Sequence, residues 1–157
     1  MYPIIRTLNE YFIDKVIYEK NAHEKLAPAS MTKIMSMLLI MEAIDNGSLG
    51  YDDDVIISKE AASMGGSQVY LQEGEVYKVN ELLKGIAIAS GNDAVVAMAE
   101  KMSGSVSAFV DLMNEKASVL NLENTNFMNP HGLDVDNHYT SARDMSIMAR
   151  ELIKHED

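Results

Sequence analysis

Two residues near the start of the chain have the types and spacing needed for nucleophilic chemistry. Ser30 and Lys33 lie three positions apart, so a helix would place the hydroxyl and the amine on one face. A serine hydroxyl becomes a good nucleophile when a neighbouring base accepts its proton, and a lysine can be that base when burial lowers its pKa. The spacing therefore indicates a serine nucleophile with a lysine base. Taken alone, however, the spacing favours a serine N-cap followed by a solvated lysine in the first turn.

A second polar group, Ser90-Gly91-Asn92, separates two apolar segments. A short turn between buried helices can hold such side chains rigidly beside another element. Ser90 would then relay a proton between Lys33 and a leaving group, while the Asn92 amide would contact both Lys33 and a substrate peptide group. The alternative interpretation is that Asn92 and Asp93 are ordinary N-cap residues.

Helices are expected to position these residues. Apolar residues recur at helical spacing over residues 29–46, with Pro28 just before this segment and Gly47 just after it. Similar patterns predict further helices over residues 58–62, 81–89, 92–102, 105–120 and 141–153. The nearly continuous apolar face of residues 81–89 favours that helix as the centre of the domain.

Little strand is expected. The run of β-branched and aromatic residues over 14–20 predicts a strand, which residues 11–13 would pair with to form one hairpin. Residues 129–132, Asn-Pro-His-Gly, mark an irregular loop between the last two helices. No composition shift divides the chain, so we expect residues 1–157 to form a single domain of the α+β class, mostly helical.

Composition excludes several classes of function. The 13 Lys and Arg against 24 Asp and Glu give a net charge of -11, which repels nucleic acid and anionic surfaces. The chain has no cysteine, and His23, His131, His138 and His155 match no metal-ligand spacing, so we expect neither a metal nor a cofactor. No signal peptide or membrane anchor is evident in the sequence.

Several blocks of sequence, in the same order, resemble the penicillin-binding D-alanyl-D-alanine carboxypeptidases. The similarity runs from about Lys15 to the end and includes the Ser-x-x-Lys and Ser-x-Asn motifs of the penicillin-recognising serine enzymes. The blocks are Val-Ile-Tyr-Glu-Lys-Asn-Ala (16–22), Ala-Pro-Ala-Ser-Met-Thr-Lys-Ile-Met (27–35), Ala-Ala-Ser-Met-Gly-Gly-Ser (61–67), Ile-Ala-Ser-Gly-Asn-Asp-Ala (88–94) and Asn-Pro-His-Gly-Leu-Asp (129–134).

This resemblance implies a function and a site. Ser30 would attack the carbonyl between the two terminal D-alanines of a peptidoglycan stem peptide, release D-alanine, and leave an acyl-enzyme for water to hydrolyse. Lys33 would be the acylation base, Ser90 and Asn92 would complete the proton relay and substrate contacts, and β-lactams would acylate Ser30. His131 would shape the loop at the cleft. The implied location is extracytoplasmic, in the bacterial cell envelope.

A third motif of this family is absent from the sequence. No Lys-Thr-Gly occurs in the 157 residues, and the family carries it on a later strand that supplies substrate contacts and half of an oxyanion hole. The resemblance therefore implies a β-lactamase/transpeptidase-like fold lacking its C-terminal strands, and an incomplete domain whose unpaired strand edges favour self-association.

Two other functions remain open. One is a truncated, non-catalytic relic that binds cell-wall peptides or β-lactams without turnover. The other is a serine β-lactamase, which the Asn129-Pro-His-Gly-Leu block disfavours because it resembles the carboxypeptidase branch.

Overall fold

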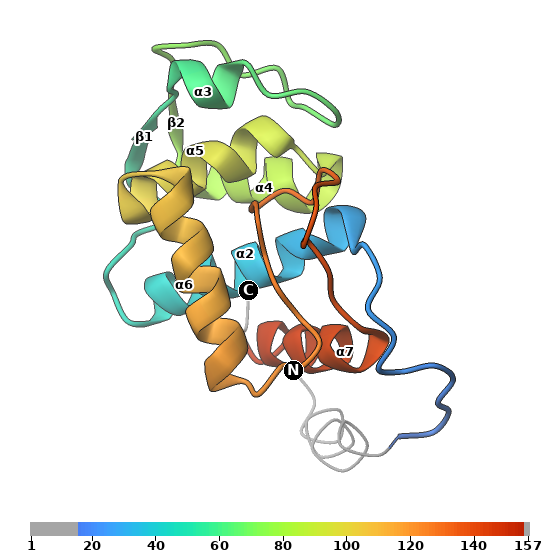
Figure 1. The fold of residues 1–157 in the computed structure, drawn as a ribbon. Coiled ribbons are helices and arrows are strands. Elements are labelled where there is room, and N and C mark those ends of the chain that lie inside the picture. Colours follow the sequence, from blue (N-terminus) through green and yellow to red (C-terminus); the bar gives the residue numbers. More distant parts are fainter. Residues whose placement is uncertain (1–15, 156–157) are drawn as a thin grey trace.

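The computed structural model describes residues 16–155, which form a mostly helical body with one small sheet (Figure 1). The elements, in order, are the 3₁₀ turn η1 (Ala29–Thr32), α2 (Lys33–Asp45), β1 (Asp54–Ile56), α3 (Lys59–Ala62), β2 (Val76–Lys78), α4 (Val79–Ala89), α5 (Asn92–Ser103), α6 (Val106–Val119) and α7 (Ala142–Leu152). The predicted fold class, α+β and mostly helical, is confirmed. Within the described range, no helix is long and apolar enough to cross a membrane.

Helix α5 is the centre of the packing. Every residue from Asn92 to Ala99 is buried, and the helix packs against α2, α3, α4, α6 and β1. Small and medium side chains fill this segment, so neighbouring elements can approach from all sides. The prediction that placed the centre in residues 81–89 is wrong, because α4 buries Val79, Leu82 and Ile86 but leaves Ile88 84% exposed.

Helix α2 is buried on two sides. It packs against α5 and α7 and also touches α6, as the central position of α2 in Figure 1 shows. Ile40 belongs to the apolar core around α4 and α5, whereas Met35 and Leu38 belong to the core that contains Phe109 of α6 and Met148 of α7. Because both cores hold α2, the N-terminal end of this helix has a fixed place in the molecule.

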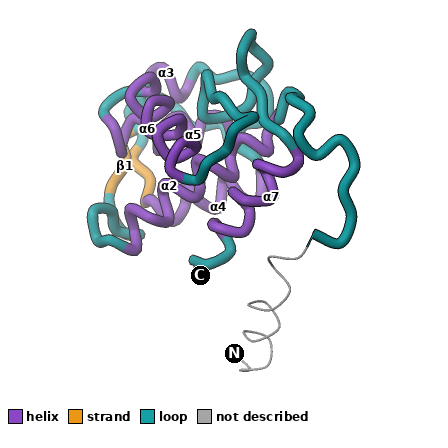
Figure 2. The backbone as a smooth tube through the Cα atoms, turned by 60° about the horizontal axis from the view of Figure 1, so that its bottom comes forward, coloured by secondary structure: helices purple, strands orange, loops and turns teal. Residues whose placement is uncertain are grey.

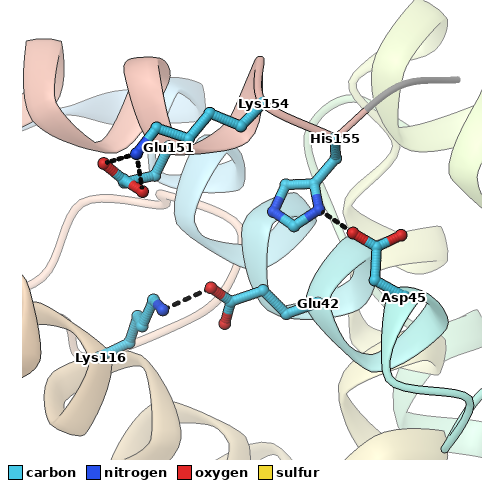
Figure 3. Close-up of polar contacts among 6 residues, drawn as sticks. All are labelled: Glu42, Asp45, Lys116, Glu151, Lys154 and His155. Atoms are coloured by element: carbon cyan, nitrogen blue, oxygen red, sulfur yellow. Dashed lines mark hydrogen bonds and ion pairs between the residues drawn. The ribbon is translucent and has the colours of Figure 1, made fainter.

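Charged contacts reinforce the other end of α2 (Figure 3). The Lys116 ammonium of α6 pairs with Glu42, and the His155 ring contacts the Asp45 carboxylate. The Lys116–Glu42 pair is the more protected one, with side-chain exposures of 19% and 34%. These contacts connect α6 and the segment after α7 to the C-terminal half of α2.

The sheet is formed by residues 54–56 and 76–78 rather than by the predicted residues 11–20. Strands β1 and β2 pair antiparallel, with Asp54 opposite Lys78 and Val55 opposite Tyr77, at one edge of the helical body (Figure 2). The Val-Ile-Ile run over residues 55–57 overlaps β1 and was the available signal, but the three aspartates directly before this run obscured the strand pattern.

The hairpin predicted over residues 11–20 is not found where the structure can test it. Residues 11–15 lie outside the described residues, and residues 16–20 form no strand. Val16, Ile17 and Tyr18 are 51%, 88% and 80% exposed, so none of the three is buried against the rest of residues 16–155. The prediction of self-association relied on the edges of that hairpin, so the described residues give it no support.

Serine caps begin three of the helices, as their sequence positions suggest. The Ser58, Ser105 and Ser141 hydroxyls each accept a hydrogen bond from a backbone N–H three residues later, which satisfies a donor that the helix leaves free. Helices α2, α4 and α5 begin without a serine cap. Helix α4 begins two residues earlier than predicted, and its N-cap is Lys78.

Candidate active site

Ser30 lies in the 3₁₀ turn η1, immediately before α2. The apolar spacing predicts Ser30 in the first turn of the long α-helix, but α2 begins only at Lys33. Residues three apart eclipse one another in a 3₁₀ turn, so the two side chains are stacked, with 3.3 Å between Lys33 Nζ and Ser30 Oγ. Ser30 is exposed to solvent, whereas Lys33 is buried. The hydroxyl is therefore accessible and the amine beside it is not.

The Lys33 amine contacts four oxygen atoms of the site. Its Nζ lies within hydrogen-bonding distance of Ser30 Oγ and Ser90 Oγ, at 3.3 Å each, and of Asn92 Oδ1 at 2.7 Å. It also lies 2.9 Å from the backbone oxygen of His131. The structure thus brings all four residues predicted from the sequence together around one nitrogen. The His131 carbonyl was not predicted, because a backbone oxygen leaves no mark in a sequence pattern.

Burial lowers the pKa of Lys33 from 10.5 to about 8. The hydrogen-bond acceptors around the ammonium are neutral, so they solvate it without offsetting the full cost of leaving water. The sequence predicted burial of this amine, and the flanking residues Pro28, Ala29, Ile34, Met35 and Met37 were expected to supply an apolar surround. The burial is found, but the direct contacts of the amine are polar oxygens, Ala29 is exposed, and Met35 packs into the core.

The acceptors determine where the lone pair of the neutral amine points. A neutral amine has two N–H donors and one lone pair. The amide oxygen of Asn92 and the carbonyl of His131 can only accept, and they are the two closest partners. They therefore occupy the two N–H groups and leave the lone pair facing the Ser30 and Ser90 hydroxyls. This arrangement can remove the proton from a serine nucleophile.

A tight turn between α4 and α5 presents Ser90 and Asn92. Ser90 ends α4 in the left-handed conformation, with φ of 56°, and Gly91 is the N-cap of α5. Asn92 is therefore not an N-cap, contrary to one of the two interpretations from sequence. Its side chain spans the site, because Oδ1 accepts from Lys33 while Nδ2 donates to the Gly65 carbonyl at 2.7 Å.

Asp93 holds a neighbouring loop against this turn. Its buried carboxylate accepts hydrogen bonds from the backbone N–H groups of Val69, Leu71 and Ala94. Asp93 is therefore not a simple helix cap either. It fixes the loop after α3, whose Gly65 carbonyl orients Asn92.

The loop between α6 and α7 supplies the His131 carbonyl. Asn129 Oδ1 accepts from the N–H of Gly132 at 2.6 Å, and the Ser36 hydroxyl of α2 donates to the Pro130 carbonyl at 2.8 Å. Gly132 has φ of +90°, and a Cβ there would lie 1.9 Å from the carbonyl oxygen of Ala29. The loop can approach the Ser30 turn this closely only with glycine at this position.

The His131 side chain shapes the loop. Its Nδ1 accepts from the N–H of Leu133 at 3.1 Å. Burial, with a smaller effect of the positive charge on Lys33, lowers the pKa of His131 to about 4, so the ring is neutral near pH 7. The hydrogen bond to Leu133 agrees with the loop-shaping role predicted for His131. In the described part of the chain, no cluster of three or more His, Asp or Glu side chains could hold a metal ion.

A separate hollow of about 730 Å³ lies between α2, α4 and α7. Its lining is mostly apolar, includes Met37, Leu83 and Ile153, and contains no serine. Since this lining offers no serine, we assign the candidate serine–lysine chemistry to Ser30.

The comparisons with known proteins agree with this geometry. A family model described as D-alanyl-D-alanine carboxypeptidase matches residues 7–157. The D-alanyl-D-alanine carboxypeptidase DacF of Bacillus subtilis is 63% identical over 142 residues, which cover 90% of this chain and 36% of DacF. The chain thus spans little more than a third of the length of that relative.

Solved structures show the same fold. The D-alanyl-D-alanine carboxypeptidase DacD from Francisella tularensis is 42% identical, with a TM-score of 0.89 over 91% of this chain and 35% of that one. Penicillin-binding protein D2 from Listeria monocytogenes, solved in its ampicillin-bound form, is 26% identical, with a TM-score of 0.77 over 89% of this chain and 57% of that one. The predicted transpeptidase-like fold class is confirmed.

The first prediction concerns the titration of Lys33. We expect its ε-carbon NMR signal to titrate with a midpoint of about 8, whereas exposed Lys78, whose pKa the hydrogen bond to Asp54 raises, should titrate above 10.5. Between pH 8 and pH 10.5, the folded and the ordinary pKa of Lys33, only the unfolded state keeps the Lys33 proton, so the free energy of unfolding should increase as pH rises through that window. A Lys33 midpoint at or above 10.5 would contradict the site as described.

The second prediction concerns Gly132. Gly132→Ala should lower the free energy of unfolding by about 1–3 kcal/mol more than Gly74→Ala, measured in urea. Gly74 is a matched control because its φ is +83° and a Cβ there would meet nothing within 4 Å. It should therefore show only the strain of a left-handed alanine, about 1–2 kcal/mol. Equal losses for the two variants would mean that the Gly132–Ala29 approach is not a constraint.

Proposed function

Since this chain belongs to the D-alanyl-D-alanine carboxypeptidase family, we propose that it carries the acylating half of a serine-type D-Ala-D-Ala carboxypeptidase. The proposed reaction removes the terminal D-alanine from peptidoglycan stem peptides. The observation that carries the proposal is the buried Lys33 amine, 3.3 Å from the exposed nucleophile Ser30. We place the reaction in the bacterial cell envelope, where that substrate lies.

Acylation begins at Ser30. Its Oγ attacks the carbonyl carbon between the two D-alanines while its proton passes to the neutral Lys33 amine. A tetrahedral intermediate forms with its charge on the former carbonyl oxygen. Lys33, now an ammonium, stays within reach of the Asn92 and His131 oxygens, which stabilise the added proton.

Ser90 connects the base to the leaving group. Its hydroxyl lies 3.3 Å from Lys33 Nζ, so it can take a proton from the ammonium and pass its own to the departing amine. The C–N bond then breaks, D-alanine leaves, and the peptide remains as an ester on Ser30. Water attacks that ester, its proton passes to neutral Lys33 and on to Ser30 Oγ, and the shortened peptide is released.

β-Lactams fit the same chemistry. Attack by Ser30 on the lactam carbonyl breaks the ring C–N bond, but the amine stays tethered to the acyl group. The ampicillin-bound form of the Listeria neighbour supports this ligand class for the present chain. Asn92 is proposed as a further substrate contact, because the Nδ2 that donates to Gly65 has a second N–H.

We propose that residues 1–157 belong to a single catalytic domain. The nucleophile, base and relay come from η1, α2 and the α4–α5 turn. A Lys-Thr-Gly strand, absent from these 157 residues, would add contacts to the substrate carboxylate and a second oxyanion donor. One oxyanion donor is worth roughly 10²–10³ in rate, so we expect the 157 residues alone to acylate slowly.

The third prediction tests this function directly. Intact-mass spectrometry after incubation with a labelled penicillin should show slow formation of a single adduct on the 157-residue chain. A chain extended with a Lys-Thr-Gly strand should label promptly, because positioning and oxyanion stabilisation multiply the reactivity of Ser30.

Ser30→Ala and Ser63→Ala provide the controls. Ser63 follows α3 and its hydroxyl donates to the Glu60 carbonyl, so Ser63→Ala should label like the unchanged chain, whereas Ser30→Ala should show no adduct. An extended chain that binds penicillin without forming an adduct would favour the alternative, a non-catalytic binding module.

A further inference from the structure

His138 joins two segments of the site without touching the proposed nucleophile. It lies just before α7 and is buried, with 4% of its surface exposed. Its Nδ1 lies 3.0 Å from the backbone N of Met128, and its Nε2 lies 2.8 Å from Thr32 Oγ1. One imidazole therefore bridges the loop that carries His131 and the turn that carries Ser30.

The partners of the ring assign its tautomer. A backbone N–H can only donate, so Nδ1 must accept from Met128 and cannot carry a proton. The ring proton is then on Nε2, which donates to the Thr32 hydroxyl. A protonated ring would turn an N–H toward the N–H of Met128 and lose that bond. Burial lowers the pKa of His138, with Asp134 acting in the opposite direction, so the neutral ring is favoured.

Thr32 lies where the turn and the loop meet. It is fully buried in η1, directly before Lys33. A Cβ on Gly132 would come within 2.9 Å of its Oγ1, so its side chain is packed against the loop. A displacement of Thr32 would therefore change the position of Lys33 relative to the His131 carbonyl.

We propose that His138 is a positioning residue for acylation, because its ring bonds both the Thr32 turn and the Met128 loop and so fixes their relative position around Lys33. With the turn and the loop in these positions, Lys33 contacts the His131 oxygen and the Ser30 hydroxyl at the same time. The kinetic part of this inference rests on the proposed acylation of Ser30. The structural part, the effect of His138 on Lys33, does not depend on it.

Two amide variants separate the two bonds of the ring. The amide nitrogen of a glutamine reaches the position of Nε2, so His138→Gln keeps the donor to Thr32. The amide oxygen of an asparagine occupies the position of Nδ1, so His138→Asn keeps only the acceptor for Met128. His138→Ala keeps neither. His23→Gln is the control, because His23 is exposed and its near neighbour is Glu19.

The fourth prediction is a set of two readouts on these variants of the extended chain. With a penicillin, His138→Ala should lower the first-order acylation rate about 10- to 100-fold, as small misplacements of reacting groups do, with the constant for the preceding non-covalent binding little changed. His138→Gln should recover most of the rate and His138→Asn less. The Lys33 titration midpoint should rise from about 8 toward 10.5 in the alanine variant and return in the glutamine variant.

The readouts distinguish failure of this inference from failure of the proposed function. If no chain acylates, the proposed function is wrong, and the Lys33 midpoint alone decides the positioning claim. If His138→Ala folds and leaves both readouts unchanged, the inference is wrong. If His138→Ala does not fold, the amide pair decides, and equal rates and equal midpoints for His138→Gln and His138→Asn would overturn the proposal.

Discussion

The burial of one amine without a counterion is the constraint on which the rest of this structure depends. Lys33 leaves water for a site whose direct contacts are hydroxyl and carbonyl oxygens, so its pKa falls to about 8. A carboxylate in the same place would raise the pKa and remove the base. The acidic residues of a chain with a net charge of -11 must therefore be kept from direct contact with this nitrogen. Asp93, next to Asn92, is kept from Lys33 in this way, because its carboxylate accepts hydrogen bonds from backbone N–H groups instead.

Much of the remaining architecture serves to hold neutral acceptors around that nitrogen. The buried helix α5 fixes Asn92, and the loop after α3 orients the Asn92 amide through Gly65. The loop before α7 brings the His131 carbonyl, and Gly132 lets it approach the Ser30 turn. These segments are far apart in the sequence, so the base exists only in the folded state.

The sequence predicted the side chains of the site but not its supports. Ser30, Lys33, Ser90 and Asn92 stood out because their spacing has a chemical reading and matches known motifs, and apolar periodicity located the helices to within a few residues. Three features could not be predicted from the sequence: the contact of the His131 carbonyl with Lys33, the bridging role of His138, and the position of the two-stranded sheet. Backbone carbonyls leave no pattern, a buried histidine looks like any other, and three-residue strands such as β1 are too short for a period-two signal.

The most direct test of this account is the pH dependence of the acylation rate constant in the extended chain. If neutral Lys33 is the base, that rate should rise with pH as a single ionisation whose midpoint is about 8, and Lys33→Met should abolish the rise. A rate that does not change across that midpoint, or one that keeps the same pH profile in Lys33→Met, would contradict the claim that the buried amine accepts the Ser30 proton.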